Sequence, residues 1–320
     1  MKSLFVLIII FFLSSGHLFS SYFQDGLSYV EVKNYSHAAT LFEKALKSNE
    51  KNQEKHLIHY YLGLCYNKLE KYDQSIDHYE KAIKIKPTWH LPYHNLALIL
   101  YEKKNDRSRA KEYFQKSIAL YPNFDIAYLN LGNLYLKEKD YNNAVKLYKN
   151  GLQYSKEDNL ISVFYNGLGN AYEGLEQYSD SIYSFKKSIE HDPDNWKSYM
   201  NLGLVHFKQD LYDEAIDDLS NVIDIKKDYV PAYFYLANCY RGKKDFNKME
   251  ETYLYILSLD PGHIDTLYGL SSYYALKERK VEMLKILKTL FFVDKTYKNI
   301  ILNEKLFQQY KDDKDFKSLF

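Results

Sequence analysis

The stretch "NGLGNAYEG", residues 166–174, is either a phosphate-binding loop or part of another structure, and the choice between them decides the fold. Three glycines and two asparagines within nine residues resemble a loop that cradles phosphate. A dinucleotide-binding fingerprint, however, requires its third glycine where Tyr172 stands. A P-loop requires Lys and then Ser or Thr after its last glycine, and here Leu175 and Glu176 follow. Neither phosphate-binding pattern is complete, so the glycines need another explanation.

The same pattern recurs along the chain with a spacing of about 34 residues. Gly169 and Gly203 are 34 residues apart, and so are Gly203 and Ala237. Related segments are "HYYLGLCY", "YLNLGNLY", "YMNLGLVH" and "YFYLANCY", which end at Tyr66, Tyr135, His206 and Tyr240. A polar turn and a second segment follow each of them, and several units close with proline, at Pro87, Pro122, Pro193 and Pro261. Such a period indicates a repeat architecture.

Each repeat is predicted to be a pair of amphipathic helices. In "YYLGLCYNKL", apolar side chains at Leu62, Cys65, Tyr66 and Leu69 share one helical stripe. Proline after the second helix ends it, because proline has no N–H to donate and clashes with the preceding turn. One helix pair is too small to bury its apolar face alone, so neighbouring pairs must stack.

These motifs resemble the tetratricopeptide repeat family, in which helix A carries an aromatic, Leu-Gly and Tyr, and helix B carries a small residue, an aromatic and Ala. The resemblance implies an all-α, right-handed superhelical solenoid of antiparallel helix pairs. About eight units fill residues 17–297, and residues 298–320 are expected to form one or two capping helices. The units begin near Phe19, His56, His90, Asp125, Ser162, Trp196, Val230 and Ile264. Positions are numbered below from these first residues.

The first 16 residues are predicted to be a secretory signal peptide. Lys2 precedes an apolar run from Leu4 to Leu13, and the small residues Ser14 and Gly16 follow it. This layout predicts export to a periplasm or to the exterior, with no stable membrane span after cleavage. The alternative is an uncleaved membrane anchor in residues 4–19.

The sequence predicts no enzyme, no cofactor and no metal site. No Ser-His-Asp or Cys-His arrangement can be assigned. The histidine pairs His56 with His59 and His90 with His94 lack an acidic or cysteine partner at a metal-ligand spacing. A net charge of +1 gives no electrostatic footprint for nucleic acid, so none is expected as a partner.

The resemblance implies that helix A side chains line a concave groove that binds peptides. The sixth and ninth positions of the repeats carry a recurrent asparagine, at Asn95, Asn130, Asn133, Asn170, Asn201 and Asn238. A carboxamide both donates and accepts hydrogen bonds, so a row of them can pair with a peptide backbone. The fifth position adds apolar candidates at Tyr60, Leu129, Met200 and Phe234. The alternative is that the asparagines only cap or solvate helix A and the apolar row packs internally.

The expected function is therefore a non-enzymatic protein–protein interaction scaffold or adaptor in an exported compartment. It would bind an extended peptide or partner segment in the concave groove. The alternative is a structural subunit of an envelope or secretion assembly that binds through its convex face or its ends, with self-association possible. The identity of the protein or peptide partner is not specified by the sequence.

Overall fold

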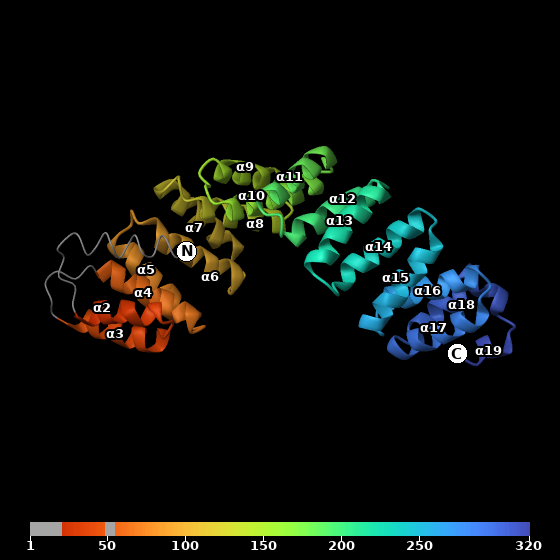
Figure 1. Cartoon of the computed structure of the whole chain (residues 1–320). Helices are drawn as coiled ribbons and strands as arrows, with labels where there is room; N and C mark the ends of the chain where they lie inside the picture. The colour runs from red at the N-terminus through yellow and green to blue at the C-terminus, as the bar shows by residue number, and fades with distance from the viewer. Residues whose placement is uncertain (1–20, 49–54) are drawn as a thin grey trace. The chain divides into compact units, whose positions relative to one another are not determined.

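The computed structural model describes residues 21–48 and 55–320, and every regular element in these residues is helical (Figure 1). The all-α prediction is confirmed. The predicted signal peptide, residues 1–16, lies outside the described residues, as does the whole of the alternative anchor, residues 4–19. The chain divides into two compact units, residues 1–156 and 157–320, and each is described by itself.

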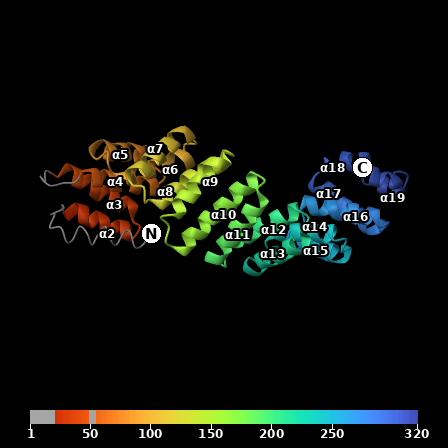
Figure 2. The same cartoon turned by 90° about the horizontal axis from the view of Figure 1, so that it is seen from above.

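The first unit contains four helix pairs in its described residues. Helices that are adjacent in sequence pack against each other in chain order, as both views show (Figures 1 and 2). The pairs are α2 (Ser21–Glu31) with α3 (Tyr35–Lys47), α4 (Lys55–Lys68) with α5 (Tyr72–Ile85), α6 (His90–Glu102) with α7 (Arg107–Leu120), and α8 (Asp125–Lys137) with α9 (Tyr141–Leu152).

The second unit contains four further pairs and a helical tail. The pairs are α10 (Asp158–Gly174) with α11 (Tyr178–His191), α12 (Trp196–Lys208) with α13 (Tyr212–Ile225), α14 (Val230–Gly242) with α15 (Phe246–Leu259), and α16 (Ile264–Leu276) with α17 (Lys280–Val293). The tail comprises α18 (Tyr297–Asn303), the 3-10 helix η1 (Lys305–Tyr310) and α19 (Lys314–Lys317). The tail buries Ile301, Phe307 and Phe316 in one cluster with α16 and α17, so it covers the last repeat.

In six of the eight pairs a ring of helix B lies against a small residue of helix A, and in the sixth and eighth pairs Leu219 and Leu287 take the place of the ring. A Cβ added to Gly63 would lie 2.7 Å from Tyr79 Cδ1, and one added to Gly132 would lie 2.6 Å from Tyr148 Cε1. In the stretch at 166–174, a Cβ on Gly169 would overlap the Phe185 ring. The glycines therefore serve close helix packing, as predicted, because only a hydrogen fits beneath the ring.

The ring position is the most deeply buried part of every repeat. The twenty-fourth position, shifted by one in the third repeat, is at most 1% exposed throughout, at Phe42, Tyr79, Phe114, Tyr148, Phe185, Leu219, Tyr253 and Leu287. The twentieth position beside it is equally buried. Where it is serine, the hydroxyl donates to the glycine carbonyl of helix A, from Ser75 to Gly63 at 2.6 Å and from Ser181 to Gly169 at 2.8 Å.

The turn from helix A to helix B uses a left-handed residue that is not glycine. One such residue occurs in each of the eight pairs, at Lys33, Glu70, Asn105, Lys139, Glu176, Asp210, Lys244 and Glu278. This conformation is disfavoured for side chains other than Asn, Asp and Gly. The residue after it is the N-cap of helix B, and in several pairs its side chain caps the helix, as Asp140 Oδ1 does by accepting from the Asn143 backbone N–H. Backbone hydrogen bonds close the turn, as from the Asp140 N–H to the Tyr135 carbonyl at 2.9 Å.

No helix in the two described ranges is long and apolar enough to cross a membrane.

The ring contact makes a prediction about single methyl groups. Gly169→Ala should lower the free energy of unfolding by about 1–3 kcal/mol, because the new Cβ overlaps the fully buried Phe185 ring. Gly203→Ala is the matched control. Its Cβ would lie 3.1 Å from Cγ of the branched Leu219 side chain, so the higher helix propensity of alanine should offset the strain.

The measurement is urea unfolding followed through Trp196, which lies in the same unit as both glycines. Adding Phe185→Leu to Gly169→Ala should restore most of the lost stability, because leucine is the residue that faces Gly203. Equal midpoints for Gly169→Ala and Gly203→Ala would contradict the proposed ring constraint.

Candidate functional site

The asparagines of the first unit connect neighbouring A helices. Asn95 Nδ2 on α6 donates to the Tyr60 hydroxyl on α4 at 3.2 Å. Asn130 Nδ2 on α8 lies 3.4 Å from His94 Nε2 on α6. Both contacts run from the sixth position of one repeat to the fifth position of the repeat before it. The amides therefore have fixed orientations on the helix A surface of this unit.

The asparagines of the second unit form a chain. Asn201 Nδ2 on α12 donates to Asn170 Oδ1 on α10 at 3.0 Å, and Asn170 Nδ2 donates to Asn166 Oδ1 at 3.2 Å. Asn166 Nδ2 in turn donates to the Ser198 hydroxyl at 2.7 Å. All three asparagines are half-buried. Three amides are thus aligned, donor to acceptor, across two A helices.

This chain continues into a buried serine cluster that the sequence analysis missed. Ser198 Oγ lies 2.7 Å from Ser188 Oγ, and Ser188 donates to the Ser162 carbonyl at 2.7 Å. All three serines have no exposed surface. A signal for them exists in the repeat register, because Ser198 occupies the position of Ala127 and Ala232. Serine in place of a packed alanine indicates a buried hydroxyl, which needs a partner.

Two asparagines at the ninth position have a different role. The Tyr148 hydroxyl donates to Asn133 Oδ1 at 2.7 Å, and the Tyr253 hydroxyl donates to Asn238 Oδ1 at 3.1 Å. Both tyrosines are rings of the twenty-fourth position. Asn238 is itself buried and donates to the Phe234 carbonyl at 2.9 Å. These two amides therefore satisfy hydroxyls that burial removes from water.

The ring at the twenty-fourth position thus determines the use of the ninth-position amide. In the fifth repeat the ring is Phe185, which has no hydroxyl, and Asn170 bonds to Asn166 and Asn201 instead. In the second repeat the ring is Tyr79 but the ninth position is Leu64. The buried Tyr79 hydroxyl has no hydrogen-bond partner in the described part of the chain. Burial raises the pKa of this phenol well above its usual range.

The apolar candidates divide into two kinds. Leu129 and Met200 are only 9% and 8% exposed, and Met200 belongs to the core between the sixth and seventh repeats. Tyr60 and Phe234 are half-buried. Tyr60 packs on Trp89 with ring centroids 4.7 Å apart, and Phe234 packs on His263 at 5.5 Å. Binding of a partner by any of the four stays a prediction.

Several oriented amides keep unused hydrogen-bonding capacity. Asn95, Asn130 and Asn201 each use one N–H in the contacts above. Among the described residues no partner contacts the carbonyl oxygens of these three side chains. Each amide therefore retains an acceptor and a second donor, as pairing with a peptide backbone requires.

One histidine contact joins the two helices of the second repeat. His59 Nδ1 on α4 lies 2.9 Å from His78 Nδ1 on α5. Burial is the main cause that lowers the pKa of His59 to about 4, and it lowers the pKa of His94 to about 3. His90 is the first residue of α6. Within the described ranges, no cluster of three or more His, Cys, Asp or Glu could hold a metal ion.

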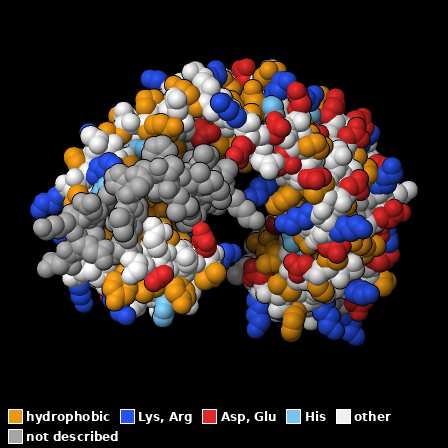
Figure 3. All heavy atoms as spheres, turned by 60° about the vertical axis from the view of Figure 1, so that its left-hand side comes forward, with side chains coloured by type: hydrophobic (Ala, Val, Ile, Leu, Met, Phe, Trp, Pro, Cys, Tyr) orange, Lys and Arg blue, Asp and Glu red, His pale blue; other side chains and the backbone are white. Residues whose placement is uncertain are grey.

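A buried hydrogen bond connects α12 and α13. His206 Nδ1 and Asp218 Oδ2 are 2.7 Å apart, and both side chains are buried. Burial raises the pKa of Asp218, and the hydrogen bond to His206 opposes that shift. The pair occupies the position where other repeats place a tyrosine of helix A, so its role is in packing. Elsewhere both signs of charge are interspersed over the face that Figure 3 displays.

The unpartnered phenol makes a prediction. Tyr79→Phe should leave the free energy of unfolding unchanged or raise it by up to about 1 kcal/mol, because it removes a buried hydroxyl that has no partner. Tyr148→Phe, the matched variant, should lower it by about 1 kcal/mol because Asn133 loses a donor. Denaturant unfolding followed through Trp89, in the same unit, measures both. A larger loss for Tyr79→Phe than for Tyr148→Phe would contradict this assignment.

Comparison with known proteins supports the helix-pair architecture. Family models described as tetratricopeptide repeat match residues 56–88, 92–124, 113–146, 166–229 and 230–263, together more than half of the chain. A solved structure of the C-terminal part of a repeat protein from Cytophaga hutchinsonii is similar, with a TM-score of 0.65 and 22% identity over 78% of this chain and 99% of that one. The structure of YrrB, a protein of this kind with an unusual peptide-binding site, has a TM-score of 0.51 and 21% identity over 60% of this chain and 96% of that one.

Curated relatives match this chain over only part of their own length. Tetratricopeptide repeat protein 37 of Xenopus laevis is 25% identical over 71% of this chain but only 17% of its own length. The Hsp70-Hsp90 organising protein of Plasmodium falciparum is 27% identical over 46% of this chain and 54% of its own length. The chain thus spans about half, or less, of these relatives. On the repeat matches and the stacked helix pairs, the chain belongs to the tetratricopeptide repeat family.

Proposed function

We propose that the chain is a non-enzymatic scaffold or adaptor that binds an extended segment of a partner protein along its helix A surfaces. The family supports protein binding in general, and the name of the Plasmodium relative describes a protein that organises two others. The observation that carries the proposal is the amide chain from Asn166 to Asn201. It holds carboxamides in fixed orientations, and among residues 21–48 and 55–320 no partner contacts the Asn201 side-chain carbonyl.

Pre-orientation favours binding because the amides do not have to be ordered when a partner arrives. Side chains that are immobilised on binding each lose rotamer entropy, and prior ordering reduces that loss. The serine cluster under Asn166 supplies the ordering in the second unit. In the first unit, Asn95 and Asn130 are held by Tyr60 and His94. An extended backbone would meet oriented amides on each unit.

The site of action is proposed to be an exported compartment, on the layout of residues 1–16. An uncleaved anchor in residues 4–19 is the alternative. Cell fractionation of the chain with and without residues 1–16 distinguishes three outcomes. They are export, membrane anchoring and retention inside the cell.

The test combines two substitutions in the amide chain. Asn170→Ala with Asn201→Ala should reduce the amount of partner that is cross-linked to the full chain by about tenfold, because both oriented amides are lost. Asn221→Ala is the control, since Asn221 is exposed on helix B of the sixth repeat. Unchanged Trp196 fluorescence establishes that the variants are folded. Equal recovery of partners by the double variant and the control would rule out the amide surface as the binding site.

A further inference from the structure

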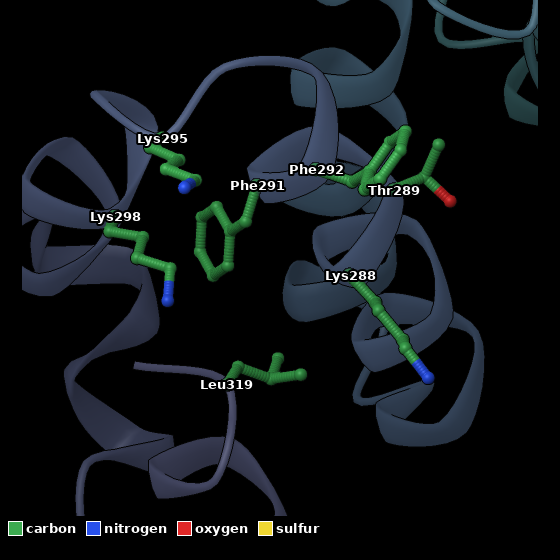
Figure 4. A pocket seen from close by; sticks show the side chains of 7 residues that line it. All are labelled: Lys288, Thr289, Phe291, Phe292, Lys295, Lys298 and Leu319. Atoms are coloured by element: carbon green, nitrogen blue, oxygen red, sulfur yellow. The ribbon is translucent and has the colours of Figure 1, made fainter.

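An apolar hollow of about 500 Å³ lies at the end of the last repeat in the second unit. It is formed by the last turns of α17, the start of α18 and the chain after α19, and the residues that line it are Lys288, Thr289, Phe291, Phe292, Lys295, Lys298 and Leu319 (Figure 4). Helix B and the tail form this hollow. It is therefore a different surface from the helix A asparagines, and it does not depend on the function proposed above.

Two consecutive phenylalanines line the hollow, Phe291 with a buried ring and Phe292 with an exposed ring. Phe291 is buried, and its centroid lies 5.1 Å from that of Phe320. Phe292, the next residue, is 88% exposed. A single exposed apolar side chain is ordinary, but here it adjoins a recess that is itself apolar. The volume lies in the range of clefts that hold ligands and peptide side chains.

The rim of the hollow carries three lysines. Lys288 and Lys295 form no ion pair with a carboxylate among the described residues. Lys298 Nζ, by contrast, donates to the main-chain oxygen of Phe320, the last residue of the sequence, at 3.3 Å, and lies 5.8 Å from the Phe291 ring centroid. Figure 4 shows Lys295 and Lys298 directed toward Phe291.

One carboxylate, Asp294, is adjacent in sequence to the lining residue Lys295. Asp294 lies between Val293 and Lys295, but its Oδ1 accepts from the Thr296 amide at 2.8 Å and the Thr296 hydroxyl at 2.7 Å. By contrast Lys280, at the start of the same helix, is paired with Asp313 and Asp315. The lining set contains three lysines and no acidic residue.

We propose that this hollow binds an acidic segment of a partner protein that carries an apolar side chain between Asp or Glu residues. The apolar side chain would enter the recess between Phe291 and Leu319, the adjoining part of the segment would cover Phe292, and the acidic residues would lie against Lys288 and Lys295. Burial of apolar area supplies affinity, and complementary charge supplies orientation and a faster encounter. A membrane surface fits less well, because the apolar side chains line a recess and do not form a broad amphipathic face.

The test is selection from a phage-displayed library of random peptides on the full chain, with Phe292→Ser as the counter-selected variant. Selected peptides should carry Phe, Leu or Trp flanked by Asp or Glu. Their affinity should fall at least about tenfold for Phe292→Ser and for Lys288→Glu with Lys295→Glu, and it should weaken with salt. The substituted side chains are all exposed, so folding should be retained.

Two matched controls lie on the same helix outside the hollow. Val281→Ser replaces another strongly exposed apolar residue, and Lys285→Glu reverses another exposed lysine. Neither should change peptide affinity.

Failure to enrich acidic peptides, or equal binding by Phe292→Ser, would overturn the proposal. So would binding to phosphatidylserine vesicles in place of peptides, or a dimer in light scattering that Phe292→Ser dissociates, which would assign the hollow to a membrane or to a second copy. None of these results depends on Asn170 or Asn201.

Discussion

The contact on which the structure depends is a helix B ring against the backbone of helix A. A glycine at the eighth position allows the ring to approach so closely that a methyl group would overlap it, as at Gly63 with Tyr79. The ring then loses all exposure, and the small twentieth residue beside it is buried as well. The turn between the helices has a left-handed residue, such as Glu176, and is closed by backbone hydrogen bonds such as that from the Gln177 N–H to the Tyr172 carbonyl at 2.9 Å. The glycine–ring fit therefore sets how closely the two helices approach in the pairs that contain it.

The same ring determines which polar groups are available on the helix A surface. A tyrosine at the twenty-fourth position carries a hydroxyl into the core, and the ninth-position amide is needed to satisfy it, as with Tyr148 and Asn133. A phenylalanine makes no such demand, so Asn170 is free to bond to its neighbours. The hydroxyl of the twenty-fourth residue thus determines whether the ninth-position amide bonds within the core or can serve recognition. This link between core and surface underlies the proposed function.

Much of the fold was predictable from the sequence, because the constraint repeats. The spacing between Gly169 and Gly203 revealed the helix pairs, and the Leu-Gly motif showed where the helices approach closely. The candidate site was less predictable. Periodicity places Asn130 and Asn170 on one helix, but it does not show which side chain from another repeat each amide meets. Leu129 and Met200 share a register with half-buried Tyr60, yet packing against the next repeat buries them.

The same limit explains the features that were missed. Ser162, Ser188 and Ser198 come from three helices, and their cluster depends on distances that no local pattern encodes. The contact between His59 and His78 joins positions 19 residues apart, so a search for close histidine pairs passes over it. The hollow at the end of α17 is formed in part by the tail, whose course over the last repeat has no counterpart in the repeats before it.

The most direct measurement is the nuclear magnetic resonance signal of the Asn170 side-chain amide in the Phe185→Tyr variant. The account predicts that the added hydroxyl donates to Asn170 Oδ1, as Tyr148 does to Asn133. The amide signals of Asn170 and Asn201 should then both shift, because Asn201 now shares or loses its acceptor, and partner recovery should fall while the fold is retained. Unchanged Asn170 and Asn201 signals in a folded Phe185→Tyr variant would contradict the claim that the core ring sets the role of the surface amide.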